Sequence, residues 1–368
     1  MKIALVHDYL NQFGGAERVL LKIHELFPDA PIYTSIYAPE KLPSEFRSLN
    51  IVTSPIQKMP FISAFTKHYT FVYPLVFENF NLSGYDIVIS STANFAKGII
   101  VKPNTMHICY CHTPPRFLYH YQTEINRRKL WYLAPLLSLF DNYLRIWDYV
   151  AAQRVTYFLT NSENTARRID KFYRRKADVI YPPVETNHQR YDSDKVGGDY
   201  YLIVSRLAQY KRIDIAIEAC NRLRQKLIII GEGKDRKRLE KMAGQTIRFI
   251  GSVNDHDRDS YIRGCKAFLF PGEDDFGITP VEAMSYGKPV IALGKGGALE
   301  TVIEGKTGTF FTEESAESLT ECLKNFDSRR YKPQDCIIQA EKFSIERFKK
   351  QFREYVDEKW VEFNQGKD

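Results

Sequence analysis

The chain of 368 residues exceeds the length that one hydrophobic core usually serves, so two domains are expected. Its content of 44% hydrophobic and 26% charged residues is typical of a globular protein and excludes a disordered chain. The net charge of +7 lies in one half: residues 1–184 carry 21 Lys and Arg against 14 Asp and Glu, and residues 185–368 carry 31 of each. We therefore expect the N-terminal half to meet an anionic partner, such as an acidic membrane surface, a phosphorylated acceptor or nucleic acid.

Export signals and membrane spans are not evident in the sequence. The opening apolar run, 1–6, is too short for the core of a signal peptide, and no apolar stretch reaches the roughly 20 residues that span a bilayer. The six cysteines lack the paired spacing of a zinc site. Four of them lie in or beside apolar runs, where a cysteine packs as a small hydrophobic residue, so a reducing compartment is expected. We expect a cytoplasmic protein that is soluble or peripheral on the inner face of the cytoplasmic membrane.

The N-terminal half alternates short apolar runs with helical patterns. The predicted strands are 2–6, 32–36, 86–90, 106–111, 157–160 and 179–181, and the predicted helices include 16–27 and 164–172. Such alternation indicates a parallel, doubly wound sheet. A polar stretch rich in Gly and Asp follows, so we predict an N-terminal domain over 1–184 and a linker over 185–199.

The C-terminal half shows the same alternation of predicted strands and helices over 200–345. The predicted strands are 201–205, 227–231, 248–251, 267–270 and 289–292, and the predicted helices are 212–224, 235–242, 258–264 and 279–286. The closing segment, 346–368, contains a long amphipathic helix that we expect to cross back to the N-terminal domain. Two doubly wound domains would form a cleft between the carboxyl ends of their sheets, where ligands bind in such folds.

Two candidate site elements belong to the N-terminal half. Gly14 and Gly15 lie between the first predicted strand and helix, where unpaired N–H groups suit a phosphate, although a plain flexible loop fits equally well. His112 ends the predicted strand 106–111. A strand-end histidine on its own is more often structural, but its loop would face the cleft.

The C-terminal half carries two further candidates. Ser205, Arg206 and Lys211 follow its first strand, and a guanidinium fork and an ammonium five residues apart can converge on a diphosphate. The second candidate is the acidic stretch 272–282. There Thr279 is predicted as the N-cap and Pro280 as the first helical position. Glu282 in the first turn would bind ribose hydroxyls, or merely complement the helix dipole.

Taken together, these elements resemble the retaining glycosyltransferases of family 4, which have the GT-B fold of two facing doubly wound domains. The resemblance covers nearly the whole chain. It is strongest at the Gly-Gly loop, at S-R-L-x-x-x-K and at Phe276–Gly287. The N-terminal stretches HDYLNQFGGAE and HICYCHTPPR look like bacterial mannosyltransferases that build lipid-linked O-antigen or capsule chains.

The resemblance implies roles for individual residues. Arg206 and Lys211 match residues that bind the donor diphosphate, and His112 matches a histidine beside the transferred sugar. The remaining implied donor contacts are Gly14, Gly15 (against the β-phosphate), Ser205, Val253 (next to the base), Glu273, Asp274, Phe276, Gly277, Ile278 and Glu282 (on the ribose). The sequence departs from the family at Asp274, which stands where the pattern has a glutamate, so sugar contact and donor preference are in question there.

The resemblance also implies a mechanism and partners. A hexose, expected to be mannose from the donor GDP-mannose, would be transferred with retention and without a covalent intermediate. The acceptor would be a lipid-linked or other glycan in cell-surface polysaccharide synthesis. Cationic side chains would stabilise the leaving diphosphate, so no metal and no resident cofactor is expected. The acidic strings 192–194 and 255–259 are interpreted as polar surface.

The alternatives are UDP-glucose or UDP-GlcNAc as donors and a nucleotide-sugar epimerase of similar fold. Nucleic-acid binding is not expected, because no binding motif is present.

Two segments of the N-terminal half mix aromatic and basic residues in a way that suits a lipid headgroup layer, namely 58–69 and 117–147. The basic residues expected to hold the anionic surface are Lys58, Lys67, Arg127, Arg128 and Lys129. We predict peripheral contact with anionic membrane through these segments, with core helices as the alternative.

Overall fold

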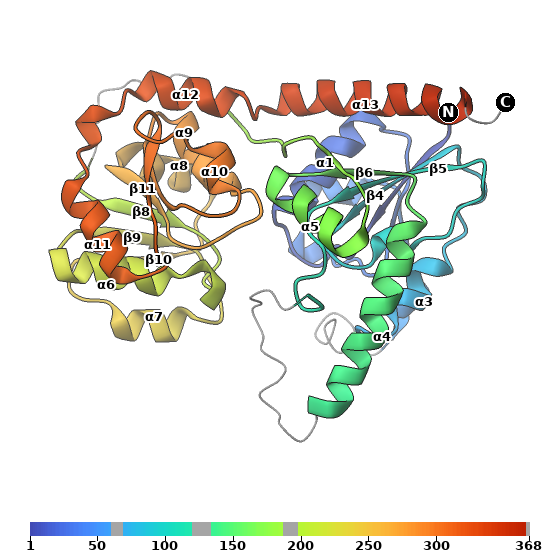
Figure 1. Ribbon diagram of the computed structural model, residues 1–368, viewed down its shortest axis with the longest axis horizontal. Helices are drawn as coiled ribbons and strands as arrows, with labels where there is room; N and C mark the ends of the chain where they lie inside the picture. The colour runs from blue at the N-terminus through green and yellow to red at the C-terminus, as the bar shows by residue number, and fades with distance from the viewer. Residues whose placement is uncertain (60–68, 120–133, 187–197, 366–368) are drawn as a thin grey trace. The chain divides into compact units, whose positions relative to one another are not determined.

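The computed structural model describes residues 1–59, 69–119, 134–186 and 198–365 (Figure 1). The chain divides into two compact units, one made of Met1–Pro183 with Phe348–Asp368 and the other of Val184–Arg347. Most of the predicted linker, 187–197, lies outside the described residues and includes the acidic string 192–194. Among the described helices, none is both long and apolar enough to cross a membrane.

The N-terminal unit is built on a parallel sheet of seven strands in the order β3-β2-β1-β4-β5-β6-β7. Its strands are β1 (Ile3–His7), β2 (Ile32–Thr34), β3 (Ile51–Thr53), β4 (Ile87–Thr92), β5 (Met106–Cys111), β6 (Tyr157–Thr160) and β7 (Asp178–Val179). Its helices are α1 (Gly15–Leu26), α3 (Tyr73–Glu78), α4 (Ala134–Gln153), α5 (Glu163–Tyr173) and the closing helix α13 (Ile345–Gln365).

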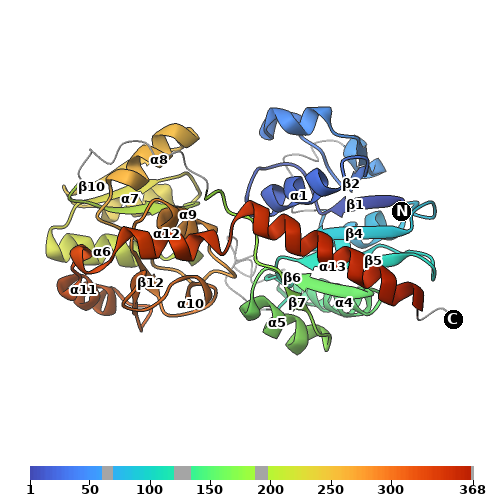
Figure 2. The same ribbon diagram turned by 90° about the horizontal axis from the view of Figure 1, so that it is seen from above.

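Helices cover both faces of this sheet, because alternate strand residues point to opposite sides. Leu5 of β1 packs with α1 and with α13, whose Phe348, Phe352 and Val356 recur every four residues along one stripe. On the other face, Ala4 and Val6 pack with side chains of α3 and α4. Figure 2 shows α13 running across the strands of the sheet. Burial on both faces explains why apolar residues occupy both sides of these strands.

The C-terminal unit contains a parallel sheet of six strands in the order β10-β9-β8-β11-β12-β13. Its strands are β8 (Tyr201–Val204), β9 (Leu227–Ile230), β10 (Ile247–Gly251), β11 (Ala267–Phe270), β12 (Val290–Leu293) and β13 (Gly308–Phe311). Its helices are α6 (Ile213–Leu223), α7 (Arg236–Met242), α8 (Asp255–Gly264), α9 (Ile278–Ser285), α10 (Ala298–Thr301), α11 (Ala316–Asn325) and α12 (Pro333–Glu341).

Both sheets place their first strand in the middle, so the chain reverses its direction of winding beside that strand. In the N-terminal unit the switch point lies between β1 and β4, where His7 pairs with Ser91 in register. In the C-terminal unit it lies between β8 and β11, which are also paired in parallel. Open α/β sheets bind ligands outside the carboxyl ends of the strands at such points, so the topology indicates where a site belongs.

The predicted α/β class with two doubly wound parallel sheets is confirmed. Two local predictions are wrong. Helix α9 has Gly277 as its N-cap, so Thr279 and Pro280 lie inside the first turn and Glu282 lies beyond it. Proline is tolerated there because the first turn leaves its N–H groups without intrahelical partners. The helix predicted over 258–264 begins three residues earlier, so the acidic string 255–259 forms the start of α8, with Asn254 as its N-cap.

Candidate active site

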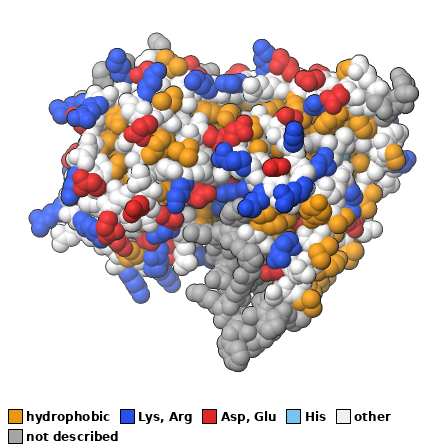
Figure 3. Space-filling view, in the orientation of Figure 1, with side chains coloured by type: hydrophobic (Ala, Val, Ile, Leu, Met, Phe, Trp, Pro, Cys, Tyr) orange, Lys and Arg blue, Asp and Glu red, His pale blue; other side chains and the backbone are white. Residues whose placement is uncertain are grey.

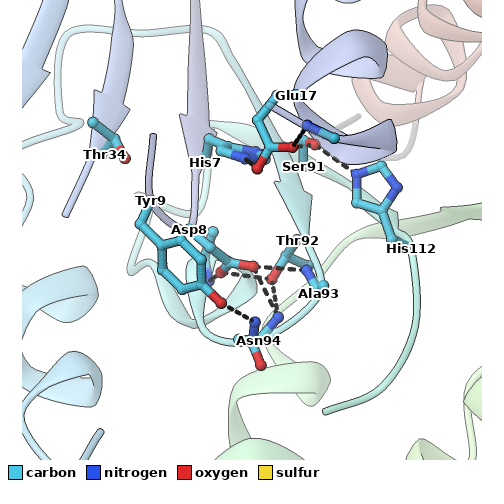
Figure 4. A network of polar contacts seen from close by, with 12 residues as sticks. His7, Asp8, Tyr9, Glu17, Thr34, Ser91, Thr92, Ala93, Asn94 and His112 are labelled. Atoms are coloured by element: carbon cyan, nitrogen blue, oxygen red, sulfur yellow. Dashed lines mark hydrogen bonds and ion pairs between the residues drawn. The ribbon is translucent and has the colours of Figure 1, made fainter. Parts of the chain in front are cut away.

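Asp8 organises the switch point of the N-terminal unit. It directly follows β1 and is only 3% exposed. Its carboxylate accepts the backbone N–H groups of Ala93 and Asn94 at 2.7 and 2.9 Å and the Thr92 hydroxyl at 3.0 Å (Figure 4). It also accepts the backbone N–H groups of Phe95 and Ala96, each at 2.7 Å. A buried carboxylate with five donors is fully compensated for the water it loses. Asp8 therefore holds the loop that follows β4 against the end of β1.

A buried ion pair continues this arrangement toward α4. Lys97, in the short 3-10 turn Ala96–Gly98, pairs with Asp148 of α4, and both side chains are completely buried. The Lys97 ammonium also donates to the Asn94 carbonyl at 2.6 Å, and Tyr119 donates to the other Asp148 oxygen at 2.9 Å. Burial lowers the pKa of Lys97, but Asp148 outweighs it, so the net direction is upward and the lysine is charged. The pair thus ties the site loop to α4.

A second line of polar side chains runs from α1 to the end of β5. The Glu17 carboxylate lies 3.7 Å from His7 Nε2, His7 Nδ1 lies 3.3 Å from Ser91 Oγ, and Ser91 Oγ lies 2.9 Å from His112 Nε2. Figure 4 shows the side chains following one another in this order. His112 comes directly after β5, as predicted, and is 9% exposed. Burial, with a smaller contribution from His7, lowers the pKa of His112 to about 3, so its ring is neutral at neutral pH.

The glycine turn before α1 is only partly available to a ligand. The Gly14 N–H donates to the second Glu17 oxygen at 2.7 Å, so it is already used within the unit. Gly15 is the first residue of α1 and is exposed. The predicted phosphate contact therefore does not hold for the Gly14 N–H, which already donates to Glu17, and stays a prediction for Gly15. A carboxylate three residues into the helix takes the N–H because the helix N-terminus favours negative charge.

In the C-terminal unit, the predicted basic loop lies at the β8 end of the switch point. Ser205 and Arg206 follow β8, and Lys211 closes the short 3-10 turn Gln209–Lys211. Lys211 forms an ion pair with Asp274, from the loop that follows β11, and its ammonium lies 5.1 Å from the centre of the Tyr210 ring. The structure thus brings together Lys211 and Asp274, which are 63 positions apart in the sequence.

Glycines allow the loops of this unit to approach one another closely. A Cβ on Gly272 would lie 2.8 Å from backbone atoms of Tyr210 and Lys211, and a Cβ on Gly297 would lie 2.3 Å from Phe276 Cα. The Gly297 N–H donates to the Asp274 carbonyl at 2.9 Å. The loop Gly294–Gly297, after β12, therefore supports the acidic loop that holds Glu273 and Asp274.

Glu282 is buried within α9 and lies close to a basic residue of α8. Burial lowers the pKa of Arg258, but the carboxylates of Glu282, Asp255 and Asp259 outweigh this effect and raise it overall. Val253, the predicted neighbour of the base, is half-buried in the loop between β10 and α8. Within the described residues, no group of three or more His, Cys, Asp or Glu side chains is arranged to hold a metal ion.

Sequence reasoning missed Asp8, His7, Glu17 and Ser91 in the N-terminal unit and Gly294–Gly297 in the C-terminal unit. The available signal was polar residues directly after apolar strands, as in His7-Asp8, and the glycine-rich string Gly-Lys-Gly-Gly after β12. Glu17 gave no such signal, because an acidic residue in a first helical turn is common.

Comparisons with known proteins agree with this architecture. Residues 13–188 match the family model described as Glycosyltransferase Family 4, and residues 185–343 match the one described as Glycosyl transferases group 1. The chain is 25% identical to the mouse alpha-1,3/1,6-mannosyltransferase ALG2, over 93% of each protein. It is 28% identical to the D-rhamnosyltransferase WbpZ of Pseudomonas aeruginosa, over 51% of this chain and 52% of that protein.

Solved structures share the fold. The structure of Anabaena Alr3699/HepE in complex with UDP has a TM-score of 0.73 and 18% identity, and covers 97% of this chain and 100% of that one. Sucrose-phosphate synthase from Thermosynechococcus elongatus has a TM-score of 0.73 and 14% identity, over 98% and 100%. With the two family models together spanning residues 13–343, the chain belongs to glycosyltransferase family 4, has the GT-B fold and is a glycosyltransferase.

Proposed function

We propose that the enzyme transfers mannose from GDP-mannose, with retention of configuration, to a hydroxyl of a lipid-linked or other glycan acceptor in cell-surface polysaccharide synthesis. The observation that carries the proposal is the pairing of Lys211 with Asp274 at the β8–β11 switch point, where this fold binds ligands. The choice of mannose is supported by relatives named alpha-1,3/1,6-mannosyltransferase, one of which matches over 93% of this chain. The guanine base rests on the resemblance of the sequence to bacterial mannosyltransferases.

The residues of the site divide the work as follows. Arg206 and Lys211 stabilise the negative charge that develops on the leaving diphosphate, because fixed cations act strongly where water is excluded. Asp274 pairs with Lys211 and contacts the transferred sugar together with Glu273. Glu282 takes the ribose hydroxyls. His112, which is neutral, contacts the sugar and does not act as a base. The departing phosphate takes the proton of the acceptor hydroxyl.

A donor screen tests this assignment. GDP-mannose is expected to raise the melting temperature, because a ligand that binds only the folded state stabilises it, and to be turned over with the α-anomeric configuration kept in the product. UDP-glucose and UDP-GlcNAc are the comparison donors, since the Anabaena structure of the same fold contains UDP. If only the UDP-sugars stabilise the protein and are turned over, the donor is a UDP-sugar and not GDP-mannose. If the enzyme releases an epimerised sugar without an acceptor, the reaction is epimerisation and not transfer.

A chelator experiment tests the role of the cations. If Arg206 and Lys211 stabilise the diphosphate, transfer continues in excess EDTA at an unchanged rate. Complete loss of transfer that magnesium or manganese restores would assign that role to a metal ion instead.

We further propose that the N-terminal unit docks on anionic membrane through α4. The outward side of this helix presents Leu139, Phe140, Tyr143, Ile146, Tyr149 and Val150, all exposed. Two further exposed side chains continue this apolar surface, namely Phe71, which precedes α3, and Leu75 of α3. The Phe71 and Phe140 ring centres lie 6.3 Å apart. Figure 3 shows hydrophobic side chains over the part of this unit where α3 and α4 lie in Figure 1.

The inner side of α4 carries the core residues Leu144 and Trp147 and the buried Asp148. The alternative prediction, a core helix, therefore applies to one side only. The basic residues Lys67, Arg127, Arg128 and Lys129 fall in 60–68 and 120–133 and lie outside the described residues. The occupant we favour is a lipid surface, because the excess positive charge of the chain lies in residues 1–184.

Co-sedimentation with vesicles tests the docking. The full chain is expected to bind vesicles that contain phosphatidylglycerol, and to be released from them by salt. The double variant Tyr143→Ser with Ile146→Ser should lose most of this binding, while the control variant Leu299→Ser with Ile338→Ser, also at exposed apolar positions, should keep it. Equal recovery of all three proteins in the supernatant would favour a soluble acceptor.

A further inference from the structure

Glu17, His7, Ser91 and His112 form a continuous line of polar contacts in the N-terminal unit. We propose that Glu17, His7 and Ser91 are positioning residues that hold the neutral His112 ring in the form with its proton on Nε2. The Nδ1 nitrogen of His112 is then an acceptor for a sugar hydroxyl. This inference rests on the proposed position of His112 beside the transferred sugar, and it concerns the N-terminal unit alone.

The argument starts at Glu17. Its side chain is 4% exposed and that of His7 is 3% exposed, so water screens their interaction weakly. A nitrogen lone pair facing a carboxylate oxygen at 3.7 Å is repelled, whereas an N–H in the same place is attracted. We therefore place the ring proton of His7 on Nε2, which faces the carboxylate. With that nitrogen as the donor, Nδ1 is the acceptor of the ring and presents a lone pair to Ser91.

Ser91 then decides the state of His112. A serine hydroxyl has one hydrogen to donate and lone pairs to accept with. That hydrogen points to His7 Nδ1, which lies 3.3 Å away and offers only a lone pair. The 2.9 Å contact between Ser91 Oγ and His112 Nε2 must consequently be donated by the histidine. The His112 proton thus lies on Nε2, and Nδ1 carries the lone pair.

The chemistry of the ring fits this role. Burial and the neighbouring His7 lower the pKa of His112, so the ring remains neutral and a single proton decides its hydrogen-bonding character. A sugar hydroxyl that donates to Nδ1 is recognised, while an N–H in that place would demand an acceptor. The same Glu17 carboxylate accepts the Gly14 N–H at 2.7 Å, so one residue fixes both the glycine turn and the start of the relay.

Nuclear magnetic resonance of histidine labelled with 15N tests the proposal without any substrate. In the full-length protein, His112 is expected to show a protonated Nε2 and an unprotonated Nδ1. Ser91→Ala removes the acceptor of the Nε2 proton, and Glu17→Gln removes the charge that orients His7. Both variants should therefore shift His112 toward a mixture of the two forms.

Ser90→Ala is the matched control. Ser90 lies on the same strand and its hydroxyl is 2.8 Å from Nε2 of another buried histidine, His107. This variant loses a bond of the same kind and should leave the His112 signals unchanged. If Ser91→Ala does not fold, Glu17→Gln still decides, because it acts from the far end of the relay.

Kinetics with GDP-mannose supply a second readout. A lost or misdirected hydrogen bond corresponds to a fall in kcat/KM of about three- to tenfold in Ser91→Ala and Glu17→Gln. Binding of free GDP should be unchanged in Ser91→Ala, because His112 contacts the sugar and not the nucleotide. Glu17→Gln is judged on kcat/KM and on the His112 signals, since it also touches the glycine turn.

The proposal is overturned if wild-type His112 carries its proton on Nδ1, or if Ser91→Ala and Glu17→Gln leave its form unchanged. The expected signals together with turnover of no sugar nucleotide would leave the positioning device standing and overturn the proposed function.

Discussion

The two units have the same strand order around their switch points, but different kinds of residues form the two sites. The N-terminal unit uses charged and hydrogen-bonding side chains that are almost completely buried, such as Asp8 and Glu17. The C-terminal unit uses close-packed glycine loops around the Lys211–Asp274 pair, whose side chains are 16% and 21% exposed.

Because of this difference, substitutions in the two sites should affect different properties of the protein, namely folding stability in one unit and ligand binding in the other. In the N-terminal unit a polar substitution leaves buried donors or charges without partners, so the fold itself is affected. In the C-terminal unit the Lys211–Asp274 pair remains within reach of water, which compensates either group when its partner is removed. We therefore expect site substitutions to cost stability mainly in the first unit and activity mainly in the second.

The largest effect is expected for Asp8→Asn. The amide group offers one acceptor oxygen and turns its N–H groups toward some of the five donors that Asp8 now satisfies. The free energy of unfolding, measured by urea titration, should fall by about 3–5 kcal/mol. Asp86→Asn is the control, because Asp86 accepts one exposed backbone N–H, from Lys2, and should change stability by less than about 1 kcal/mol. Equal losses in the two variants would contradict the central place of Asp8.

The next largest effect is on activity, in Lys211→Ala and Arg206→Ala. Each variant removes a cation proposed to bind the diphosphate, and a hydrogen bond to a charged group contributes about 1.5–3 kcal/mol, so kcat/KM should fall at least tenfold. The melting temperature should barely change, because neither side chain is deeply buried. Lys237→Ala, on the exposed side of α7, serves as the control and should be active. Wild-type turnover in either folded variant would remove the diphosphate assignment.

A smaller effect concerns the dependence of stability on pH. Burial, together with the positive charges of Arg154 and Arg175, lowers the pKa of His107 to about 3. Below its ordinary pKa of 6.5, His107 takes up a proton only when the chain unfolds, so stability is lost as the pH falls from 6.5 toward 3. His107→Gln should reduce this slope by about 1.4 kcal/mol per pH unit in urea titrations between pH 6 and pH 4.

The exposed His256 provides the control for this experiment, because His256→Gln should leave the slope as it is in the wild type. A wild-type slope in His107→Gln would show that His107 is protonated in the folded protein.

The smallest effect is expected for Asp274→Glu, which restores the glutamate of the family pattern. The charge is kept and the carboxylate moves outward by one methylene, so the pair with Lys211 can form again with a small adjustment. We expect kcat/KM to change by less than about fivefold, since the contact is shifted rather than lost. Asp274→Asn is the companion variant, and it should lose more because it no longer pairs with Lys211. A larger loss in Asp274→Glu than in Asp274→Asn would mean that reach, and not charge, decides this position.

Much of the C-terminal site could be predicted from sequence, because its parts are short strings that follow strands. Ser205–Lys211 and Gly272–Glu282 each lie within one loop and helix start, and most predicted strands agree with the structure to within two residues. Strands β3 and β13 were missed, since three- and four-residue strands carry little periodic signal. The start of α9 was predicted too late, because a Thr followed by Pro is typical of an N-cap and first helical position. In the structure Gly277, with a left-handed backbone, is the N-cap and the helix begins at Ile278.

Strand periodicity and glycine placement are local properties, so the fold class, the two units and the loops with the basic and acidic residues of the C-terminal unit could be predicted from sequence. In the N-terminal unit, sequence indicated the glycine turn and His112, and the polar network around them follows from the folded sheet. Asp8 meets a loop more than 80 positions away, Ser91 lies between His7 and His112, and Lys97 pairs with Asp148. Parallel strands that are distant in sequence bring their carboxyl ends together, and burial then selects which polar side chains must satisfy one another.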